Sequence, residues 1–151
     1  MPFKKQPLPF EFLPLVEKGN RLMRDGKKVE AEEHYERAAK LCPEAWLGVA
    51  HEEMKAGNSK VAMERAKQVL KYATQDKTRA MCLSFVGILM NNGGCRKAAE
   101  AWFRESFALW KRGETCANVG LCCMHEHRLD EAEKWINKAL RMDPANYTMA
   151  F

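Results

Sequence analysis

The sequence lacks several features that mark particular classes of protein. It has no long uninterrupted apolar run, so neither a signal peptide nor insertion into a membrane is predicted. Its six cysteines form no CxxC pair and accompany no secretory signal, which favours reduced thiols and a cytoplasmic location. No Gly-rich phosphate loop occurs. No stretch alternates between apolar and polar residues, so no β-sheet is expected.

Charge of one sign is not concentrated anywhere in the chain. Lys and Arg number 25 against 20 Asp and Glu, a net charge of +5, but the two signs are interleaved. No basic run with aromatic residues between its cations marks a nucleic-acid surface, so no nucleic-acid partner is expected. The 151 residues are enough for one domain with a continuous core, and a hydrophobic fraction of 46% is that of an ordinary globular protein.

No catalytic or metal-binding constellation stands out. Cys122, Cys123, His125 and His127 are close in the sequence, and Cys123 and His127 have a spacing that puts two ligands on one helix face. Because zinc normally takes four ligands and no second pair of matching spacing exists, no metal site and no cofactor is predicted. His51 belongs to no recognisable acid–base motif in the sequence. The chain is therefore expected not to be an enzyme.

What the sequence contains is a helical period of apolar residues, interrupted by turn signals. The pattern begins at Phe12. Its interruptions are Asp25-Gly26, Gly57-Asn58, a polar connector from Tyr72 to Lys77, the strong breaker Asn91-Asn92-Gly93-Gly94, and Asp143-Pro144. Pro43 is expected in the first turn of the third helix. The sequence therefore predicts a chain made only of helices.

Residues 1–11 are too rich in proline to be helical and are expected to run extended. Apolar residues occur through this segment and into the first helix: Phe3, Leu8, Phe10, Phe12 and Leu13. Two interpretations remain open. The segment folds back over the first helices, or it occupies a groove in its own chain or in a neighbouring chain.

The helical pattern recurs in register four times. One turn position is held by Gly26, Gly57, Gly94 and His127. Alanine stands five residues later in every copy, at Ala31, Ala62, Ala99 and Ala132, followed after four more residues by Tyr35, Ala66, Phe103 and Ile136. Small residues precede the turn at Gly19, Ala50, Gly87 and Gly120. The small residues let two helices approach closely, and pairs must stack because one pair cannot bury its own apolar face.

This order of small, aromatic and alanine positions resembles the tetratricopeptide repeat, whose period is about 34 residues. The resemblance covers residues 12–145, with copies starting near residues 12, 43, 80 and 113, and leaves a short tail at 146–151. It implies an all-α fold, a right-handed superhelix of four antiparallel helix pairs (an α-solenoid). It also implies a non-catalytic module that binds a protein or peptide.

In this family the first helix of each pair lines a concave groove that holds the ligand. The resemblance places these residues in that groove: Asn20, Leu47, His51, Met54, Phe85, Ile88, Asn91, Asn92, Asn118, Leu121 and Met124. Adaptable methionines and other apolar side chains suit an apolar or amphipathic peptide, and asparagine amides can bond to the backbone of such a ligand. The resemblance therefore implies an adaptor or chaperone-like module.

The family's best-known ligand is the C-terminal tail of heat-shock chaperones, whose carboxylate is held by a clamp of Lys, Asn and Arg. Asn20 matches the clamp, whereas Val16, Gly48, Met81 and Phe85 stand at its other positions. Binding of a chaperone tail is therefore not expected.

A second function remains open. Such arrays usually end in a capping helix with a polar outer face, and the residues after Met142 are too few for one. Either the chain continues in a longer protein, or the last helix pair, at Leu129 to Leu140, contacts another chain. The second explanation predicts an oligomerising scaffold, a possible homo-oligomer, whose mass in light scattering depends on concentration.

Overall fold

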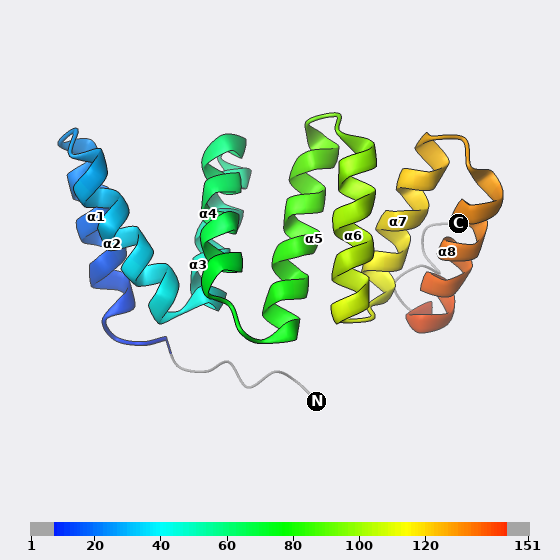
Figure 1. Cartoon of the computed structure of the whole chain (residues 1–151), viewed down its shortest axis with the longest axis horizontal. Coiled ribbons are helices and arrows are strands. Elements are labelled where there is room, and N and C mark those ends of the chain that lie inside the picture. The colour runs from blue at the N-terminus through cyan, green and yellow to red at the C-terminus, as the bar shows by residue number, and fades with distance from the viewer. Residues whose placement is uncertain (1–7, 145–151) are drawn as a thin grey trace. The chain divides into compact units, whose positions relative to one another are not determined.

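The computed structural model describes residues 8–144, and within them the chain forms eight α-helices and no strand (Figure 1). The helices are α1 (Phe12–Arg24), α2 (Lys28–Leu41), α3 (Pro43–Lys55), α4 (Ser59–Tyr72), α5 (Asp76–Asn92), α6 (Arg96–Leu109), α7 (Gly113–His125) and α8 (Leu129–Met142). The predicted all-α fold and its antiparallel helix pairs are confirmed. No helix of the described residues has both the length and the apolar character that a membrane crossing requires.

The chain divides into two compact units, Met1–Ala73 (unit 1) and Thr74–Phe151 (unit 2). In unit 1, α1 packs on α2 and α3 on α4, and α2 also contacts both helices of the second pair. In unit 2, α5 packs on α6, α6 on α7 and α7 on α8. Each unit therefore consists of two helix pairs that share one core. The predicted segment 1–11 and tail 146–151 lie mostly outside the described residues.

The turn inside each helix pair contains one residue with a positive φ. Gly26, Gly57 and Gly94 have φ of 78°, 85° and 86°, and His127 has φ of 61°. Glycine adopts this left-handed conformation without a steric penalty because it has no Cβ. Histidine has a Cβ and pays that penalty. The four residues that share one turn position in the sequence thus share one backbone conformation.

Two predicted helix ends are wrong by a few residues. The polar connector from Tyr72 to Lys77 is shorter than predicted, since Tyr72 belongs to α4 and α5 begins at Asp76. An acidic side chain in the first turn favours a helix start, and Thr78 is buried two residues later. At the other end of α5 the helix continues through Asn92, so only Gly93-Gly94 interrupts it. Pro43 occupies the first turn of α3, as predicted.

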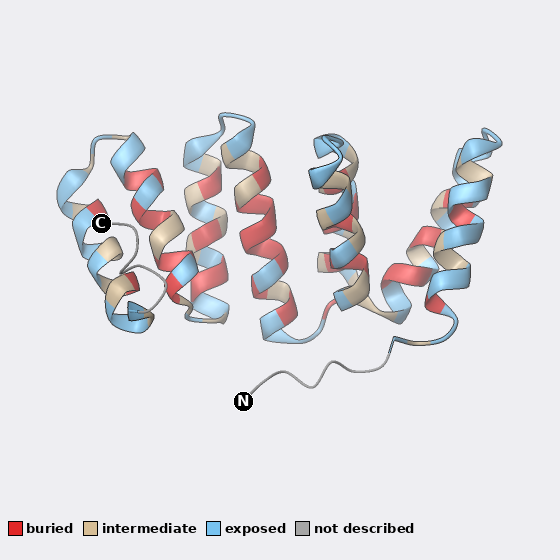
Figure 2. Cartoon of the chain, turned by 180° about the vertical axis from the view of Figure 1, so that it is seen from behind, coloured by how far each residue is buried: buried red, intermediate tan, exposed pale blue. Residues whose placement is uncertain are grey.

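The two helices of a pair approach each other where a small residue faces a large one. A Cβ built on Gly19 would lie 2.5 Å from Cε1 of Tyr35, and one on Gly87 would lie 2.6 Å from Cε1 of Phe103. The same construction on Gly120 meets Cγ1 of Ile136 at 2.7 Å. Figure 2 shows the buried residues along these facing sides. The predicted small-against-large packing is therefore present in both units.

The core of unit 1 contains a charged side chain that the sequence pattern did not reveal. Trp46 is fully buried and lies edge-on to Phe12 and tilted against Tyr35. Arg65 is 5% exposed, and its guanidinium carbon lies 4.3 Å from the centre of the Tyr35 ring. Its Nη1 is 3.1 Å from Oε2 of Glu32. Stacking on two aromatic rings and pairing with a carboxylate together offset the cost of burying this cation.

The core of unit 2 is built from apolar clusters, and its buried polar side chains among the described residues are the hydroxyls of Thr78, Ser84, Ser106 and Thr115. One cluster joins Phe103 to residues of the other helices: Ala99, Val119, Cys122, Cys123 and Ala132, with Ile88, Met90 and Trp135 packed against it. A second cluster contains Phe107, Cys116 and Ala139. Trp135 contacts both clusters, and its ring lies edge-on to that of Phe107 at 5.5 Å. Trp135 therefore contributes to both contacts between the second helix pair of the unit and the first.

The first apolar residues of the described chain behave differently from one another. Phe12 is 3% exposed because it packs on Trp46. Phe10 is 87% exposed and Leu13 is 54% exposed, so the expectation that they fold over the first helix pair is not met by these two side chains. Phe3 lies outside the described residues.

Candidate functional site

In unit 1 the predicted groove residues lie on α1 and α3 and differ in exposure. Asn20 is exposed, and its Oδ1 accepts a hydrogen bond of 2.6 Å from the hydroxyl of Tyr35. Leu47 is 3% exposed and belongs to the core. His51 and Met54 are half-buried. This part of the predicted site therefore offers Met54 and His51 to a ligand, while the Asn20 carbonyl is engaged inside the protein.

The imidazole of His51 is held in its neutral form. Burial lowers the pKa of His51 most, and the nearby Lys55 ammonium lowers it further, while the Glu52 carboxylate opposes them. Since the ordinary value is 6.5, His51 is uncharged at neutral pH. An uncharged ring beside Met54 suits an apolar ligand better than an imidazolium does.

In unit 2 the predicted residues of α5 lie mostly in the interior. Phe85 is 1% exposed, and Ile88 packs against the Phe103 cluster. Asn91 is half-buried and Asn92 is exposed at the end of the helix. The sequence pattern overlooked Met81, which is 41% exposed on the same helix, seven residues before Ile88. A spacing of seven residues corresponds to two helical turns, so the sequence could have placed Met81 on the same face of the helix as Ile88.

The predicted residues of α7 lie on a common surface of that helix. Leu121 is 46% exposed and Met124 is 43% exposed, three residues apart. Ala117 and Asn118 are half-buried and precede Leu121 by four and three residues, so all four lie on one face. The core side of α7 carries the buried residues Cys116, Val119, Gly120 and Cys123. We call the surface of Ala117, Asn118, Leu121 and Met124 the α7 stripe.

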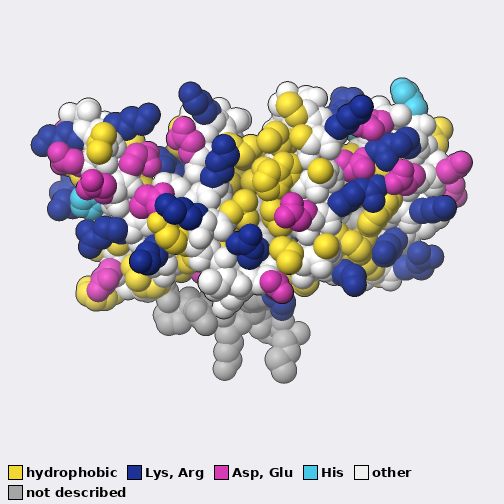
Figure 3. All heavy atoms as spheres, viewed as in Figure 1, with side chains coloured by type: hydrophobic (Ala, Val, Ile, Leu, Met, Phe, Trp, Pro, Cys, Tyr) yellow, Lys and Arg dark blue, Asp and Glu magenta, His cyan; other side chains and the backbone are white. Residues whose placement is uncertain are grey.

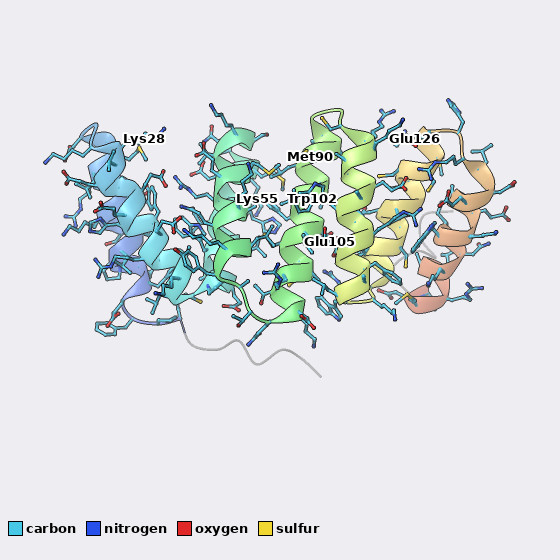
Figure 4. The ribbon with its side chains drawn as sticks, viewed as in Figure 1. Lys28, Lys55, Met90, Trp102, Glu105 and Glu126 are labelled. Carbon is cyan, nitrogen blue, oxygen red and sulfur yellow. The ribbon has the colours of Figure 1, made fainter. Side chains whose placement is uncertain are left out.

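The sequence pattern also did not predict a network of ion pairs in unit 2. Glu100 of α6 accepts from Arg104 at 2.9 Å and from Arg128, which follows α7. Arg104 and Arg128 both bond to Glu131 of α8, and Arg128 also donates to Glu126 at 3.0 Å. Figure 4 labels Glu126, which directly follows α7. The network links α6 to α8 and to the turn that precedes α8. It therefore stabilises the packing of these helices.

The ionisation of Glu100 follows from this network. Burial is the largest single influence and raises the pKa of the Glu100 carboxyl, but hydrogen bonds and attraction from Arg128 and Arg104 together lower it below its ordinary value of 4.5. Glu36 in unit 1 behaves similarly, since the hydrogen bond from the Tyr72 hydroxyl is the main cause that lowers its pKa. Both carboxylates favour the folded state when ionised.

The cysteines and histidines offer little reactive chemistry. Burial raises the pKa of the Cys82 thiol to about 12 and also raises the pKa of Cys116, Cys122 and Cys123. These thiols are therefore protonated at neutral pH, and a protonated thiol is a poor nucleophile and metal ligand. Across residues 8–144, no three His, Cys, Asp or Glu side chains are grouped closely enough to hold a metal ion.

The charge on the surface is mixed. On the face in Figure 3, basic and acidic side chains are interleaved, and neither sign gathers into a field of its own. This agrees with the interleaving of charges along the sequence and supplies no positive track for a phosphate backbone on that face.

The last helix pair matches a known repeat family. Residues 113–146 match the family model of the tetratricopeptide repeat. The last helix pair is therefore a tetratricopeptide repeat. The match starts at Gly113, the first residue of α7, and includes all of α8, so the α7 stripe lies on the first helix of a recognised repeat. Tetratricopeptide repeats build binding surfaces for proteins, and the family therefore indicates protein partners.

Solved structures share the fold at low sequence identity. MamA is 16% identical with a TM-score of 0.65, and the match covers 89% of this chain and 80% of MamA. The Pseudomonas aeruginosa protein pilF is 18% identical with a TM-score of 0.62, over 88% of this chain and 61% of pilF. A chain of the APC/C hetero-tetramer Cut9-Hcn1 is 20% identical with a TM-score of 0.61, over 86% of this chain and 26% of that one. No curated protein matches the chain in sequence.

Proposed function

We propose that this tetratricopeptide-repeat protein is a non-catalytic binding module, adaptor or chaperone-like in action, that holds an apolar or amphipathic peptide on the first helices of its pairs. The observation that carries the proposal is the α7 stripe, where Leu121 and Met124 are exposed side by side within a recognised repeat. Isolated exposed apolar residues are ordinary, but two large ones on successive turns form a surface that a partner can cover.

The chemistry of the stripe supports a peptide with apolar side chains. Covering the exposed parts of Leu121 and Met124 removes apolar area from water, which is worth about 25 cal/mol per Å². A thioether chain adapts its shape to different ligands. The amide of Asn118 on the same face has donors and an acceptor for a ligand backbone. Met54 and His51 in unit 1 and Met81 on α5 provide further surface of the same kind.

The site also determines which substitutions can test it. A charge at Phe85 or Leu47 would enter the core, because these side chains are 1% and 3% exposed, and unfolding would mimic a loss of binding. Leu121 and Met124 can be changed without this ambiguity. Leu129, which is 63% exposed on α8, offers a matched control for a Leu-to-Asp substitution away from the stripe.

The experiment uses peptides selected from a random library on the wild-type chain and measures their affinity by fluorescence anisotropy. Leu121→Asp and Met124→Asp are each expected to weaken binding at least about tenfold, about 1.4 kcal/mol, while Leu129→Asp leaves it unchanged. Circular dichroism checks that each variant is folded. Selected peptides without apolar residues, or binding that survives both substitutions, would refute the proposal.

A second candidate function is an oligomerising scaffold that assembles through the last helix pair. The observation that favours it is the exposure of Leu129 at 63% and of Met142 at 41%, at the two ends of α8. Light scattering over a range of concentrations distinguishes the two candidates, since peptide binding requires no increase in mass.

A further inference from the structure

Inside each unit, the same glutamate position contacts the next helix pair. Glu32 and Glu100 each follow the aligned alanine by one residue, and both accept hydrogen bonds from arginine in the following pair. In unit 1 the arginine is Arg65, three residues after Ala62. In unit 2 it is Arg128, four residues before Ala132, so the two arginines reach the glutamate from different register positions. The glutamate at this position therefore acts as the anionic half of the contact between successive pairs.

A second position supplies the apolar half of the same contact. Phe107 stands eight residues after the aligned alanine and packs against Cys116 of the following pair. In unit 1 the corresponding residues are Ala39 and Trp46, both fully buried. In unit 2 the large residue, Phe107, is on the earlier pair and the small one, Cys116, is on the later pair. In unit 1 the order is reversed, with the small Ala39 on the earlier pair and the large Trp46 on the later pair. The combined size of the two residues stays similar, as dense packing requires.

The outer face of α8 carries a residue at each of these two positions, the glutamate and the apolar residue. Glu133 follows Ala132 by one residue and is exposed, and Leu140 stands eight residues after Ala132 and is half-buried. These are the register positions of Glu100 and Phe107. The face of α8 therefore has the residues with which α2 and α6 hold the next pair.

The first helix pair has a hollow at the complementary positions. It lies between α1 and α2, and its walls include Leu15, Lys18, His34 and Arg37, together with Phe10 and Glu11 before α1. Leu15 has the register of Trp46 and Cys116, and His34 has that of Arg65. Leu140 and Leu15 are both of intermediate size, so this pairing again keeps the combined size.

Charge complements the size match. Lys18, His34 and Arg37 surround the hollow against one acidic wall residue, Glu11, and the register puts Glu133 opposite His34 and Arg37. A carboxylate meeting this set repeats the pairing of Glu32 with Arg65, whose Nη1 and Oε2 are 3.1 Å apart. Opposite charges at a contact favour the correct register and disfavour others.

We propose that the occupant of this hollow is α8 of a second copy, so that the protein associates head to tail. Glu133 of one copy pairs with His34 and Arg37 of the next, and Leu140 of the first packs on Leu15 of the second. This inference rests on the second candidate function above and names its two surfaces. Because the two surfaces differ, the contact is heterologous, and copies add in succession to form a ring or a filament. The α7 stripe takes no part in this contact.

The test measures the mass of the whole chain by light scattering and by analytical ultracentrifugation as concentration rises. Wild type is expected to increase in mass. Glu133→Arg and Arg37→Glu are each expected to weaken association about tenfold or more, because like charges then face each other. Glu64→Arg, the same change at an exposed position of α4 outside the register set, is the control and should associate like wild type.

A rescue experiment addresses the geometry directly. The double variant Glu133→Arg/Arg37→Glu carries a reversed pair at every head-to-tail contact, so its association should return toward wild type. A mixture of the two single variants should also associate, since each retains one native surface. Both variants change exposed residues, and circular dichroism confirms that they are folded.

Three results would overturn the inference. Association that neither single variant weakens would refute the head-to-tail contact and leave a scaffold of another geometry. A chain that stays monomeric at every concentration, both with and without residues 1–7, would refute both the contact and the scaffold, and would leave peptide binding as the function. A chain that associates only after residues 1–7 are removed would identify its own first residues as the occupant of the hollow.

Discussion

At the scale of single residues, His127 has the least favourable backbone conformation of the described chain. Its φ of 61° is the only positive value outside glycine among residues 8–144. A Cβ in the left-handed region costs about 1–2 kcal/mol. The other three pairs have glycine at this position, so the fourth pair is expected to be the easiest to improve.

His127→Gly should therefore stabilise the protein by about 1 kcal/mol, after allowance for the greater freedom of glycine in the unfolded chain. For a protein of this size, that corresponds to a rise of about 2–4 °C in Tm. Thermal denaturation followed by circular dichroism measures it. Gly94→Ala is the reciprocal control and should lower Tm, because Gly94 has φ of 86°. An unchanged or lower Tm for His127→Gly would contradict the shared turn geometry.

Thr115 carries the one buried side-chain oxygen in the described residues that has no hydrogen-bond partner. The residue is 1% exposed in α7. A buried hydroxyl without a partner keeps its desolvation cost, and valine has nearly the same shape. Thr115→Val should therefore raise the free energy of unfolding by about 1 kcal/mol, measured by urea denaturation.

A second buried hydroxyl provides the contrast to Thr115. Ser106 Oγ donates a hydrogen bond of 2.6 Å to the carbonyl oxygen of Ala80. Ser106→Ala should lower the free energy of unfolding by about 1 kcal/mol, because the buried hydrogen bond to that carbonyl is lost. The same sign of change in Thr115→Val and Ser106→Ala would show that the hydrogen bonds do not distinguish the two sites.

At the scale of helices, close approach within the first and third pairs depends on a glycine facing an aromatic ring. Gly87→Ala would put a Cβ 2.6 Å from the ring of Phe103, and a ring in a packed core moves little. The substitution is expected to destabilise unit 2 by about 1–3 kcal/mol. Gly48 is the control, because it is exposed on α3 and a Cβ there would have no neighbouring atom within 4 Å. Gly48→Ala should stabilise by about 0.5–1 kcal/mol through helix propensity alone.

The pair can also be tested by compensation. Phe103→Leu makes room beside residue 87, so the double variant Gly87→Ala/Phe103→Leu should be more stable than the sum of the single effects predicts. Urea denaturation of the four proteins measures the coupling. Strict additivity would show that Gly87 and Phe103 do not limit the approach of α5 and α6.

The ion network between α6 and α8 predicts a dependence of stability on pH. The folded protein lowers the pKa of Glu100 below 4.5, so the carboxylate stabilises the fold above that pH and its contribution is lost as the pH falls through the folded-state value. Glu100→Gln should therefore be less stable than wild type at neutral pH, with a gap that closes on acidification. Urea midpoints of both proteins across this range measure the gap, and a gap independent of pH would contradict the role given to the network.

Helix positions and turns could be predicted from the sequence because they depend on local chemistry. Gly26, Gly57 and Gly94 mark turns through their backbone freedom, and Pro43 marks a helix start through its missing amide hydrogen. Arg65 could not be predicted as a core residue, because its burial depends on Tyr35, Trp46 and Glu32 meeting around it in three dimensions.

The candidate site divides along the same line. The repeat register gives the helix face on which Phe85, Leu121 and Met124 lie, but exposure depends on which side chains cover that face. Phe85 is covered, whereas Leu121 and Met124 are not. Peptide binding remains a prediction, both for the buried Phe85 and for the exposed Leu121 and Met124. The exposed pair on α7 is now the part of it that experiment can address most cleanly.

At the scale of the whole molecule, the chain is a set of helix pairs in two compact units, each with its own core. Unit 1 is held by aromatic rings around Arg65, and unit 2 by apolar clusters and the Glu100 network. In neither unit do the described residues present convergent catalytic groups, and the family indicates protein partners. The central claim is therefore that the first helices bind a peptide through apolar side chains.

The most direct measurement of that claim is an NMR titration of the chain labelled with ¹³C at its methionine methyl groups, using a peptide selected on the wild-type protein. The signal of Met124 is expected to shift as the peptide binds. The signal of Met63, which is half-buried on α4, should not shift. A peptide that binds while the Met124 signal remains unchanged would contradict the account.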